Sequence, residues 1–295
     1  MEEVVKSNRF NRSVLVAVAA LGLVGLAACS SGSTASTDAS APAASEATAA
    51  ASEAPADQGV ANAGTITVGT ITDAKPYAYS ENGELTGFEI DLIRAAAERA
   101  GLTPELTTMD FSALLAAVNN GQFDVVASAV GITDERKELV DFSNGYLAGY
   151  FALLTKDAKV GDLASVSGKK IGVLQGSIQD TNAAVLIPGA EVVRFPDTNS
   201  ATQALNTDRV EGIFIDYETA LDNTKKDDKL SIPFTVPATD FPAGWAVKKG
   251  NEALLTTLNA ALDELVADGT WMTLYTKYFP EAPVPTDTEM PPYVK

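Results

Sequence analysis

Residues 110–146, DFSALLAAVNNGQFDVVASAVGITDERKELVDFSNGY, decide more of the fold than any other stretch. DFSALLAAVNNG predicts a helix that Asp110 or Ser112 caps, and FDVVASAV predicts a strand. A glycine and a polar turn follow, where Arg136 stands among acidic residues. In a chain of formal net charge -18, this arginine either pairs with its acidic neighbours on a solvated turn or binds something that is not protein. The spacing alone leaves both interpretations open.

The residues before this stretch continue the same alternation. TITVGTI (65–71) and PELTTM (104–109) predict strands, because they are short and rich in β-branched or apolar residues. GFEIDLIRAAAERAG (87–101) predicts a helix with Ile93, Ala96 and Ala97 on one face and Gly101 as its stop. The order strand–helix–strand–helix–strand predicts a parallel sheet with right-handed crossovers.

A second alternating series begins near Tyr150. Strands are expected at 150–155, 170–175, 210–216, 229–236 and 244–249, and helices at 199–209, 217–223, 251–269 and 270–279. Two such series predict two α/β lobes. Ligands of open α/β sheets bind beyond the carboxyl ends of the strands, so a cleft between the lobes is the expected pocket.

Composition excludes several kinds of chemistry. The chain of 295 residues has no histidine, which removes Ser-His-Asp and Cys-His triads and histidine-ligated zinc. Its single cysteine, Cys29, allows neither a disulfide within the chain nor a cysteine metal cluster. With 39 acidic against 21 basic residues, nucleic acid is not an expected partner. We expect no bound metal or cofactor.

The N-terminus predicts an export signal. Lys6, Arg9 and Arg12 precede an uncharged apolar run at 14–28, which is too short for a membrane span of about 20 residues. The run ends in LAAC (26–29), which resembles the lipobox of bacterial lipoproteins and implies cleavage before Cys29 and lipidation of that cysteine. The alternative is an ordinary signal peptide. Residues 30–63 are rich in Ala, Ser, Thr and Pro and predict a disordered tether with a span of roughly 30 Å.

Five stretches in this order resemble the extracytoplasmic amino-acid-binding proteins of ABC importers, solute-binding family 3. They are GELTGFEIDLIRAAAERAGL (83–102), residues 110–146, GKKIGVLQGSIQD (168–180), DRVEGIFIDYETAL (208–221) and LDELVADGTWMTLYTKYF (262–279). The resemblance covers residues 65–279. It implies the two-lobe type II periplasmic-binding-protein fold (Venus-flytrap), in which each lobe is a mostly parallel α/β sheet flanked by helices.

The resemblance implies roles for residues of the first lobe and for one acid of the second. Thr133 and Arg136 match the family's T-x-x-R turn, whose arginine holds the α-carboxylate of an amino acid, and a guanidinium fork suits that group. The carbonyl of Ala129 would accept from the α-ammonium, and the N–H of Gly131 would contact the carboxylate. Asp216 matches the acid that pairs with the α-ammonium. Its alternative role is the N-cap of the following helix.

Three more residues follow from the same resemblance. Ser177 and Ile178 lie in the turn that would direct N–H groups of the second lobe at the carboxylate. Phe111 would pack on the ligand side chain, and its alternative is a core position.

The sequence departs from the family pattern at several of these positions. Gly131 lacks a hydroxyl, and Ile178 stands where many relatives carry threonine. In the first loop Ile71 replaces an acid found in binders of cationic ligands, and Ala74 replaces a tyrosine. These changes disfavour lysine or arginine as the ligand. Asp73 is kept as a candidate ligand-binding residue that prevents their exclusion.

The expected organisation has six parts. These are the lipoprotein signal peptide (1–28), Cys29 with the tether (29–63), the first part of lobe 1 (64–148), lobe 2 (149–241), the return to lobe 1 (242–280) and a tail (281–295). The hinge is expected near 147–149 and 241–244, where the chain crosses between lobes.

The resulting hypothesis is a binding protein and not an enzyme. It would be a monomer on the outer face of the cytoplasmic membrane that captures a free polar amino acid by lobe closure and delivers it to a membrane permease with its ATPase. Two alternatives remain: a cyclohexadienyl dehydratase-like enzyme that uses cleft carboxylates such as Asp216 or Glu218, and a sensor that reports the ligand to a receptor.

Overall fold

The computed structural model describes residues 58–157 and 160–282. The predicted signal peptide, Cys29, nearly all of the tether and most of the tail lie outside these residues. Two five-stranded sheets and one small sheet make up the strands described. We call the part built on the first sheet, from elements at 65–142 and 246–278, lobe 1, and the part built on the second, from elements at 150–237, lobe 2.

The sheet of lobe 1 has the strand order β5-β1-β6-β13-β7. Its strands are β1 (Thr65–Thr70), β5 (Thr103–Thr108), β6 (Val125–Val126), β7 (Val140–Phe142) and β13 (Ala246–Lys248). The first three strands are parallel, as the strand–helix alternation predicts. β13 comes from much later in the chain and runs antiparallel to both its neighbours. The C-terminal part of the chain therefore completes the first lobe.

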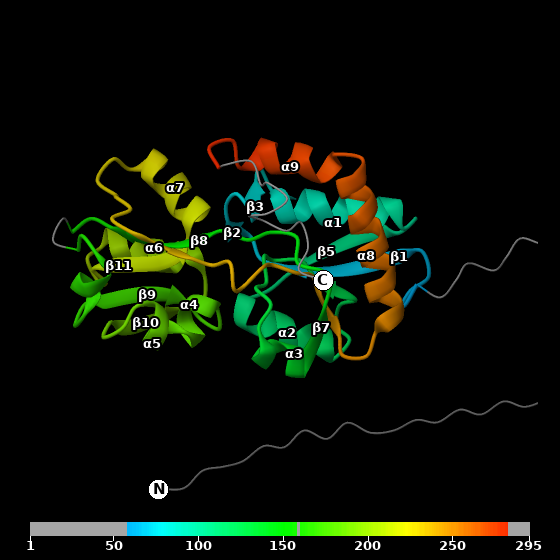
Figure 1. The fold of residues 1–295 in the computed structure, drawn as a ribbon, viewed down its shortest axis with the longest axis horizontal. Coiled ribbons are helices and arrows are strands. Elements are labelled where there is room, and N and C mark those ends of the chain that lie inside the picture. The colour runs from blue at the N-terminus through cyan, green and yellow to red at the C-terminus, as the bar shows by residue number, and fades with distance from the viewer. Residues whose placement is uncertain (1–57, 158–159, 283–295) are drawn as a thin grey trace, which may run out of the picture. The chain divides into compact units, whose positions relative to one another are not determined.

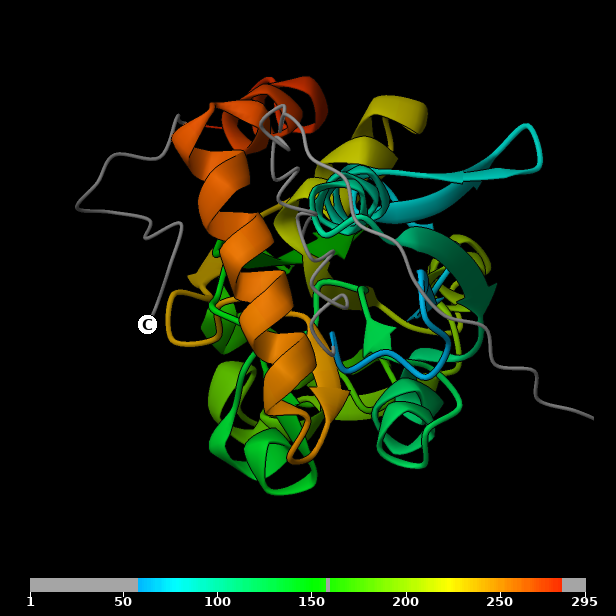
Figure 2. The same cartoon turned by 90° about the vertical axis from the view of Figure 1, so that its right-hand side faces the viewer.

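Helices cover both faces of this sheet (Figures 1 and 2). They are α1 (Phe88–Arg99), α2 (Phe111–Asn119), α3 (Asp134–Leu139), α8 (Glu252–Ala267) and α9 (Thr270–Tyr278). One core contains the apolar faces of α1, α8 and α9 and the rings of Phe88 and Trp271, which meet edge to face with centroids 6.1 Å apart. A second core lies beneath α2 and contains Leu114 and Val118. The helical stripes seen in the sequence are thus core.

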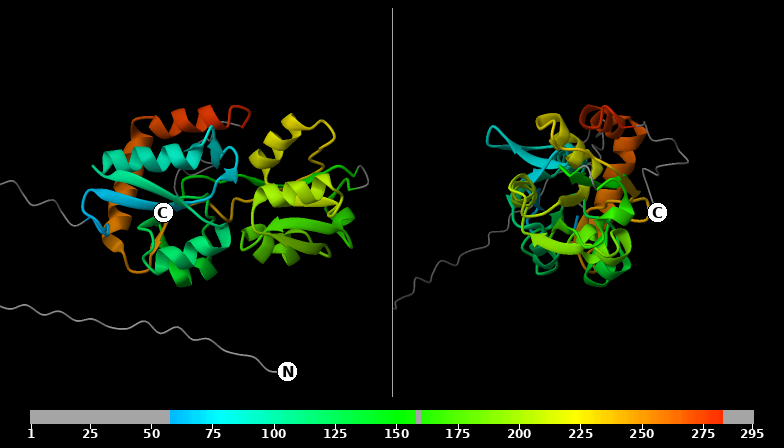
Figure 3. Two further views of the ribbon diagram at one scale, coloured as in Figure 1. Left: turned by 180° about the vertical axis from the view of Figure 1, so that it is seen from behind. Right: turned by 90° about the vertical axis from the view of Figure 1, so that its left-hand side faces the viewer.

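The sheet of lobe 2 (Figure 3) has the order β10-β9-β11-β8-β12, in which the first three strands are parallel and the last two pairings are antiparallel. Each lobe therefore has a mixed sheet, whereas the expectation from the sequence was a mostly parallel one. Its strands are β8 (Tyr150–Thr155), β9 (Lys170–Leu174), β10 (Glu191–Phe195), β11 (Gly212–Asp216) and β12 (Thr235–Pro237). Its helices are α4 (Ile178–Thr181), α5 (Ala183–Leu186), α6 (Thr198–Asn206), α7 (Tyr217–Lys226) and the 3₁₀ turn Leu163–Val166. Separate apolar clusters fill its two faces, one with α4 and α5 and one with α6 and α7.

The chain crosses between the two sheets twice, between β7 and β8 and between β12 and β13. The crossings lie against each other, because Leu147 and Ala243 form an isolated antiparallel bridge. The N–H of Ala243 donates to the carbonyl of Leu147 at 2.6 Å, and the N–H of Tyr146 donates to the carbonyl of Ala243 at 2.9 Å. Both segments expected to form the hinge lie in these crossings. Within the described residues, no helix has the length and apolar character that a membrane crossing requires.

Several elements differ from the sequence-based expectation, and two of them lie beside the cleft. FDVVASAV keeps only Val125 and Val126 as strand, because the chain leaves the extended conformation at Ala129, whose φ is +47°. The expected first loop instead forms a small antiparallel sheet of β2 (Asp73–Ala74), β3 (Ala78–Glu81) and β4 (Glu84–Thr86). Both deviations place backbone beside the cleft. Elsewhere, the strand expected at 229–236 is reduced to Thr235–Pro237, and α4 and α5 were not among the expected helices.

Candidate functional site

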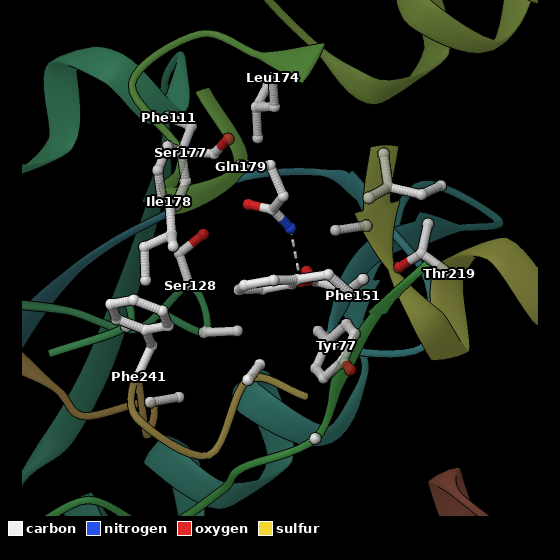
Figure 4. Close-up of a pocket in the computed structure, with 18 of the residues that line it drawn as sticks. Tyr77, Phe111, Ser128, Phe151, Leu174, Ser177, Ile178, Gln179, Thr219 and Phe241 are labelled. Carbon is white, nitrogen blue, oxygen red and sulfur yellow. Dashed lines mark hydrogen bonds between the residues drawn. The ribbon is translucent and has the colours of Figure 1, made fainter. Parts of the chain in front are cut away.

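A pocket that is partly open to solvent is lined by residues of both lobes. Seven of the eight ligand-binding residues predicted from the sequence line it: Phe111, Ala129, Gly131, Arg136, Ser177, Ile178 and Asp216. Figure 4 shows part of this lining, including Phe111, Ser177 and Ile178. Residues distant in the sequence therefore meet at one site.

Arg136 points inward, from the first turn of α3. The hydroxyl of Thr133 caps that helix by accepting from the N–H of Arg136 at 3.1 Å. The guanidinium donates to the carbonyl of Gly131 at 2.7 Å and, in lobe 2, to the carbonyl of Gly176 at 2.9 Å. Burial lowers its pKa to about 10, so it stays charged at neutral pH. A guanidinium has five N–H donors, so others remain for a ligand.

The surface ion pairs considered for Arg136 are not formed within the described residues. Asp141 instead pairs with Lys249, and Asp134 pairs with Lys137 at 3.4 Å. The guanidinium carbon of Arg136 lies 5.7 Å from the centre of the Phe111 ring, which adds a cation–π contact. The arginine is thus a partly buried cation at the pocket wall whose neighbours there are carbonyls and a ring.

Asp216 ends β11 at the same pocket. The amide of Gln179 donates to its carboxylate at 2.9 Å, which Figure 4 marks with the dashed line. Asp216 holds the N-cap position of α7, but its side chain makes no capping hydrogen bond. Burial, and then the charge of Glu218, raises the pKa of Asp216 from 3.8 to about 7. The site therefore presents a carboxylate that a nearby cation would stabilise.

Gly131 and Ile178 face each other across the lobes. A Cβ added at Gly131 would lie 2.2 Å from Cδ1 of Ile178, so no other residue fits at position 131 without a shift. Ser177 caps α4, because its hydroxyl accepts from the N–H of Asp180 at 3.2 Å. Its own N–H donates to the carbonyl of Leu174 at 3.1 Å, so of the two predicted amides only that of Ile178 stays a candidate.

Asp73 lies outside this pocket, and we correct its assignment. Its carboxylate accepts from the N–H groups of Thr198 at 2.6 Å and Asn199 at 3.1 Å, at the start of α6 in the other lobe. Free helix N–H groups and the positive end of the helix dipole attract a carboxylate, and this explains the placement. Asp73 links the lobes and is not retained as a ligand-binding residue.

Several pocket residues were not assigned to the site from the sequence. Gln179 orients Asp216, and Ser128 and Thr219 place buried hydroxyls at the wall. The hydroxyl of Tyr77 donates across the lobes to Glu218, which lies just behind the pocket. Gln179 directly follows the predicted Ser177–Ile178 turn, and this position could have identified it as a pocket residue from the sequence. Thr219 is an ordinary helix residue by pattern, so no local signal marked it.

Comparison with known proteins identifies the family. The profile of bacterial extracellular solute-binding proteins, family 3, matches residues 66–281. The chain therefore belongs to this family, whose members are extracellular. The match spans both sheets and nearly all of the described residues.

Individual relatives are binding proteins for different amino acids. The L-cystine-binding protein of Escherichia coli (strain K12) is 32% identical over 209 residues, 69% of this chain and 78% of that protein. The ABC transporter glutamine-binding protein of Bacillus subtilis (strain 168) is 31% identical over 211 residues, 68% of this chain and 76% of that protein. These relatives are named for binding and not for catalysis, so we describe the chain as a binding protein and not as an enzyme.

A solved structure of a similar protein shows that the fold is shared as well. An ancestral arginine-binding protein bound to arginine is 35% identical, with a TM-score of 0.69, covering 73% of this chain and 98% of that one. The structural neighbours share the type II periplasmic-binding fold. The three relatives are named for cystine, glutamine and arginine, so membership of the family leaves the ligand open.

Proposed function

We propose that this protein is the substrate-binding lipoprotein of an ABC importer and that it captures a free amino acid between its lobes. One observation carries the proposal. Arg136 of lobe 1 and Asp216 of lobe 2 line one pocket, carry opposite charges, and have no ion pair of their own within the described residues. An α-amino acid has a carboxylate and an ammonium on one carbon, which suits such a pair.

The binding step follows from the geometry. The carboxylate of the ligand docks on the free N–H donors of Arg136, where the fork geometry suits it. The ammonium contacts Asp216 and the carbonyl of Ala129, and the amides of Gly131 and Ile178 supply further donors. A buried charge is stabilised only when it is paired, so both ends of the ligand need the partners that the two lobes bring.

Ligand capture is coupled to lobe closure in this proposal. A ligand that contacts both lobes favours the closed state over the open one, because its contacts are complete only there. The segments near 147–149 and 241–244, within the paired crossings, are the expected hinge. The closed form is then recognised by the permease of the importer, a partner supported by the relative named as an ABC transporter glutamine-binding protein.

A thermal-shift screen of the common amino acids tests the ligand class. One or a few amino acids should raise the unfolding midpoint of the purified protein by mass action. Arg136→Ala should lose roughly a hundredfold or more in affinity, because it removes one partner of a buried charge. Arg209→Ala, at an exposed position outside the pocket, is the matched control. The absence of any shift, after refolding to strip carried ligand, would contradict the proposal.

Membrane anchoring is a separate part of the proposal and rests on the LAAC sequence at 26–29. Acyl chains on Cys29 would hold the mature protein at the outer face of the cytoplasmic membrane, with residues 30–63 as a tether. Cell fractionation checks it: wild-type protein should sediment with membranes, and Cys29→Ser should not. Intact mass should show the lipid on the wild type alone. Recovery of the wild-type protein in the soluble fraction with an unmodified Cys29 would contradict the proposed membrane anchoring.

A further inference from the structure

The charges of the pocket limit the side chain of its ligand. Among the described residues that line it, Arg136 and Asp216 are the only charged ones. In the proposed binding mode, the α-carboxylate of the ligand pairs with Arg136 and its α-ammonium pairs with Asp216, so neither residue is left for a charge on the side chain. A further charge on the ligand side chain would meet a wall without a partner of opposite sign, and burying an unpaired charge is strongly unfavourable.

Much of the remaining wall is aromatic or aliphatic. Phe151 and Phe241 stack with ring centroids 6.3 Å apart, and Phe151 meets Phe214 at 6.0 Å. The first-loop positions Ile71 and Ala74 also line the pocket. Figure 4 shows Phe151, Phe241 and Leu174 among the residues that line the pocket.

Three acids lie close behind the wall among the described residues. Glu89 accepts from the N–H of Ala129 and Asp73 from the N–H of Thr198, so both are held by backbone of the lining, and Glu218 is the third. A Cβ added at Gly149 would lie 3.9 Å from both of its carboxylate oxygens. However, Glu218 does not line this pocket, and the hydroxyl of Tyr77 donates to its Oε2. This carboxylate is therefore engaged with Tyr77 and is not presented to the cavity.

Two buried hydroxyls of the wall have no hydrogen-bond partner within the described residues: Ser128 Oγ of lobe 1 and Thr219 Oγ1 of lobe 2. Both residues are 4% exposed, and both line the pocket. Figure 4 shows them on opposite sides of the group of lining residues. Buried polar atoms are nearly always paired, so two unpaired hydroxyls at one cavity point to a ligand that pairs with them.

We propose that the ligand is an amino acid whose side chain is uncharged and carries a hydrogen-bonding group, and that the hydroxyls of Ser128 and Thr219 are ligand contacts. This inference rests on the proposed function and narrows its substrate class. Each hydroxyl both donates and accepts, so an amide or a hydroxyl on the ligand can be satisfied without a second charge.

Titration calorimetry on the purified protein tests the substrate class. The probes are L-glutamine, L-asparagine, L-serine and L-threonine against L-arginine, L-lysine, L-glutamate, L-aspartate and L-cystine, whose side chains all carry charge, and against L-leucine and L-phenylalanine. At least one probe of the first group should bind tenfold or more tightly than every other probe. Preference for a charged or purely apolar side chain would overturn the inference. Arginine or lysine binding that Glu218→Gln abolishes would identify Glu218 as the missing partner and would overturn the inference as well.

The variants Ser128→Ala and Thr219→Val test the two contacts. Each should weaken binding of the preferred amino acid by roughly fivefold to thirtyfold, the value of a hydrogen bond. Neither should lower the midpoint of the ligand-free protein, because each removes a buried polar atom that has no partner among the described residues. Thr155→Val is the matched control: that hydroxyl donates to the carbonyl of Glu211 away from the pocket, so stability should fall and affinity should not.

The outcomes separate this inference from the function on which it rests. Unchanged affinity in both variants would overturn the assignment of the contacts. If no amino acid binds at all, the proposed function fails and this inference fails with it. If a charged amino acid binds through Arg136, the proposed function stands and only the inference fails.

Discussion

At the scale of single residues, Gly131 and Ile178 form a matched pair where the lobes meet. Neither carries a hydroxyl, the group that the family resemblance led us to expect at both positions. The structure gives the reason for their coexistence: the space that a side chain at 131 would need is filled by Cδ1 of Ile178, 2.2 Å from the added Cβ. Space, and not backbone strain, selects glycine at this position, because its φ is not in the left-handed region.

Gly131→Ser should therefore weaken ligand binding by roughly tenfold or more, because overpacking at the contact holds the lobes apart. Ile178→Val removes Cδ1 and leaves Cγ1, which lies at 3.5 Å from the added Cβ. The double variant should regain much of the affinity, and Ile178→Val alone should change it little. Calorimetry over this double-mutant cycle measures the coupling. Additive effects, with no rescue, would contradict the matched pair.

Asp216 predicts a pH dependence of stability. Its pKa rises from 3.8 to about 7 on folding, through burial and the charge of Glu218. The native state holds the proton more tightly, so stability is lost as pH rises from about 4 to about 7, and the loss is complete above 7. Asp216→Asn keeps an acceptor for Gln179 and should stabilise the ligand-free protein by roughly 1 to 3 kcal/mol at pH 8.

Urea unfolding of the two proteins at pH 4 and pH 8 measures this effect. The difference should nearly vanish at pH 4, where the aspartate is neutral in the folded state. The same variant should bind its amino acid far more weakly, because the ammonium loses its counter-charge. An equal stability difference at both pH values would show that charge is not the cause.

At the scale of elements, α8 anchors the return of the chain to lobe 1. Leu254, Leu258, Leu262 and Leu265 are all buried on its inner face. Its N-terminus is fixed by Asn251, whose Oδ1 accepts from the N–H of Leu254 at 3.2 Å and whose Nδ2 donates to the carbonyl of Gly59 at 2.8 Å. The cap thus joins the helix to the first described residues of the chain.

Asn251→Ala should lower the free energy of unfolding by about 1 kcal/mol, since it removes the cap. Asn251→Asp keeps the capping oxygen, suits the positive end of the helix dipole and loses only the bond to Gly59, so its effect should be smaller. Chemical denaturation with unchanged m-values measures both. Equal losses in the two variants would assign the effect to the Gly59 contact instead of the cap.

At the scale of the whole described fold, a few polar contacts link the lobes independently of a ligand. They include the bonds from Thr198 and Asn199 to Asp73, from Tyr77 to Glu218, and from Arg136 to the carbonyl of Gly176, and the ion pair of Lys75 with Asp222 at 3.9 Å. Each favours the closed arrangement, so each contributes to the affinity for any ligand that needs closure.

Asp73→Ala should weaken amino-acid binding by roughly threefold to thirtyfold although Asp73 lies outside the pocket, because it shifts the protein toward the open state. Small-angle scattering of the ligand-free variant should show a larger radius of gyration. The matched control is Asp197→Ala, which removes a cap of the same helix from within lobe 2, where Oδ1 accepts from the N–H of Ser200 at 2.7 Å. Equal losses of affinity in the two variants would mean that helix stability, and not closure, is the cause.

The sequence by itself determined the features that depend on neighbouring residues. Hydrophobic periodicity predicted α1, α2, α8 and α9 and the parallel core strands, because 3.6- and 2-residue repeats select the same face whatever lies opposite. The role expected of Arg136 came from the resemblance of Thr133 and Arg136 to the family's T-x-x-R turn, since the spacing alone had left a surface ion pair equally open.

Only the tertiary structure decided which distant groups meet. The bond between Tyr77 and Glu218 joins residues 141 apart in the chain, and the bond between Asp73 and Thr198 joins residues 125 apart. Asp73 was therefore misassigned, and Thr219 was not recognised, since a helix pattern does not say what its buried hydroxyl faces. The raised pKa of Asp216 was not predicted from the sequence either, because it results from burial in the folded protein. Desolvation and pairing depend on packing between lobes, and no local pattern encodes that packing.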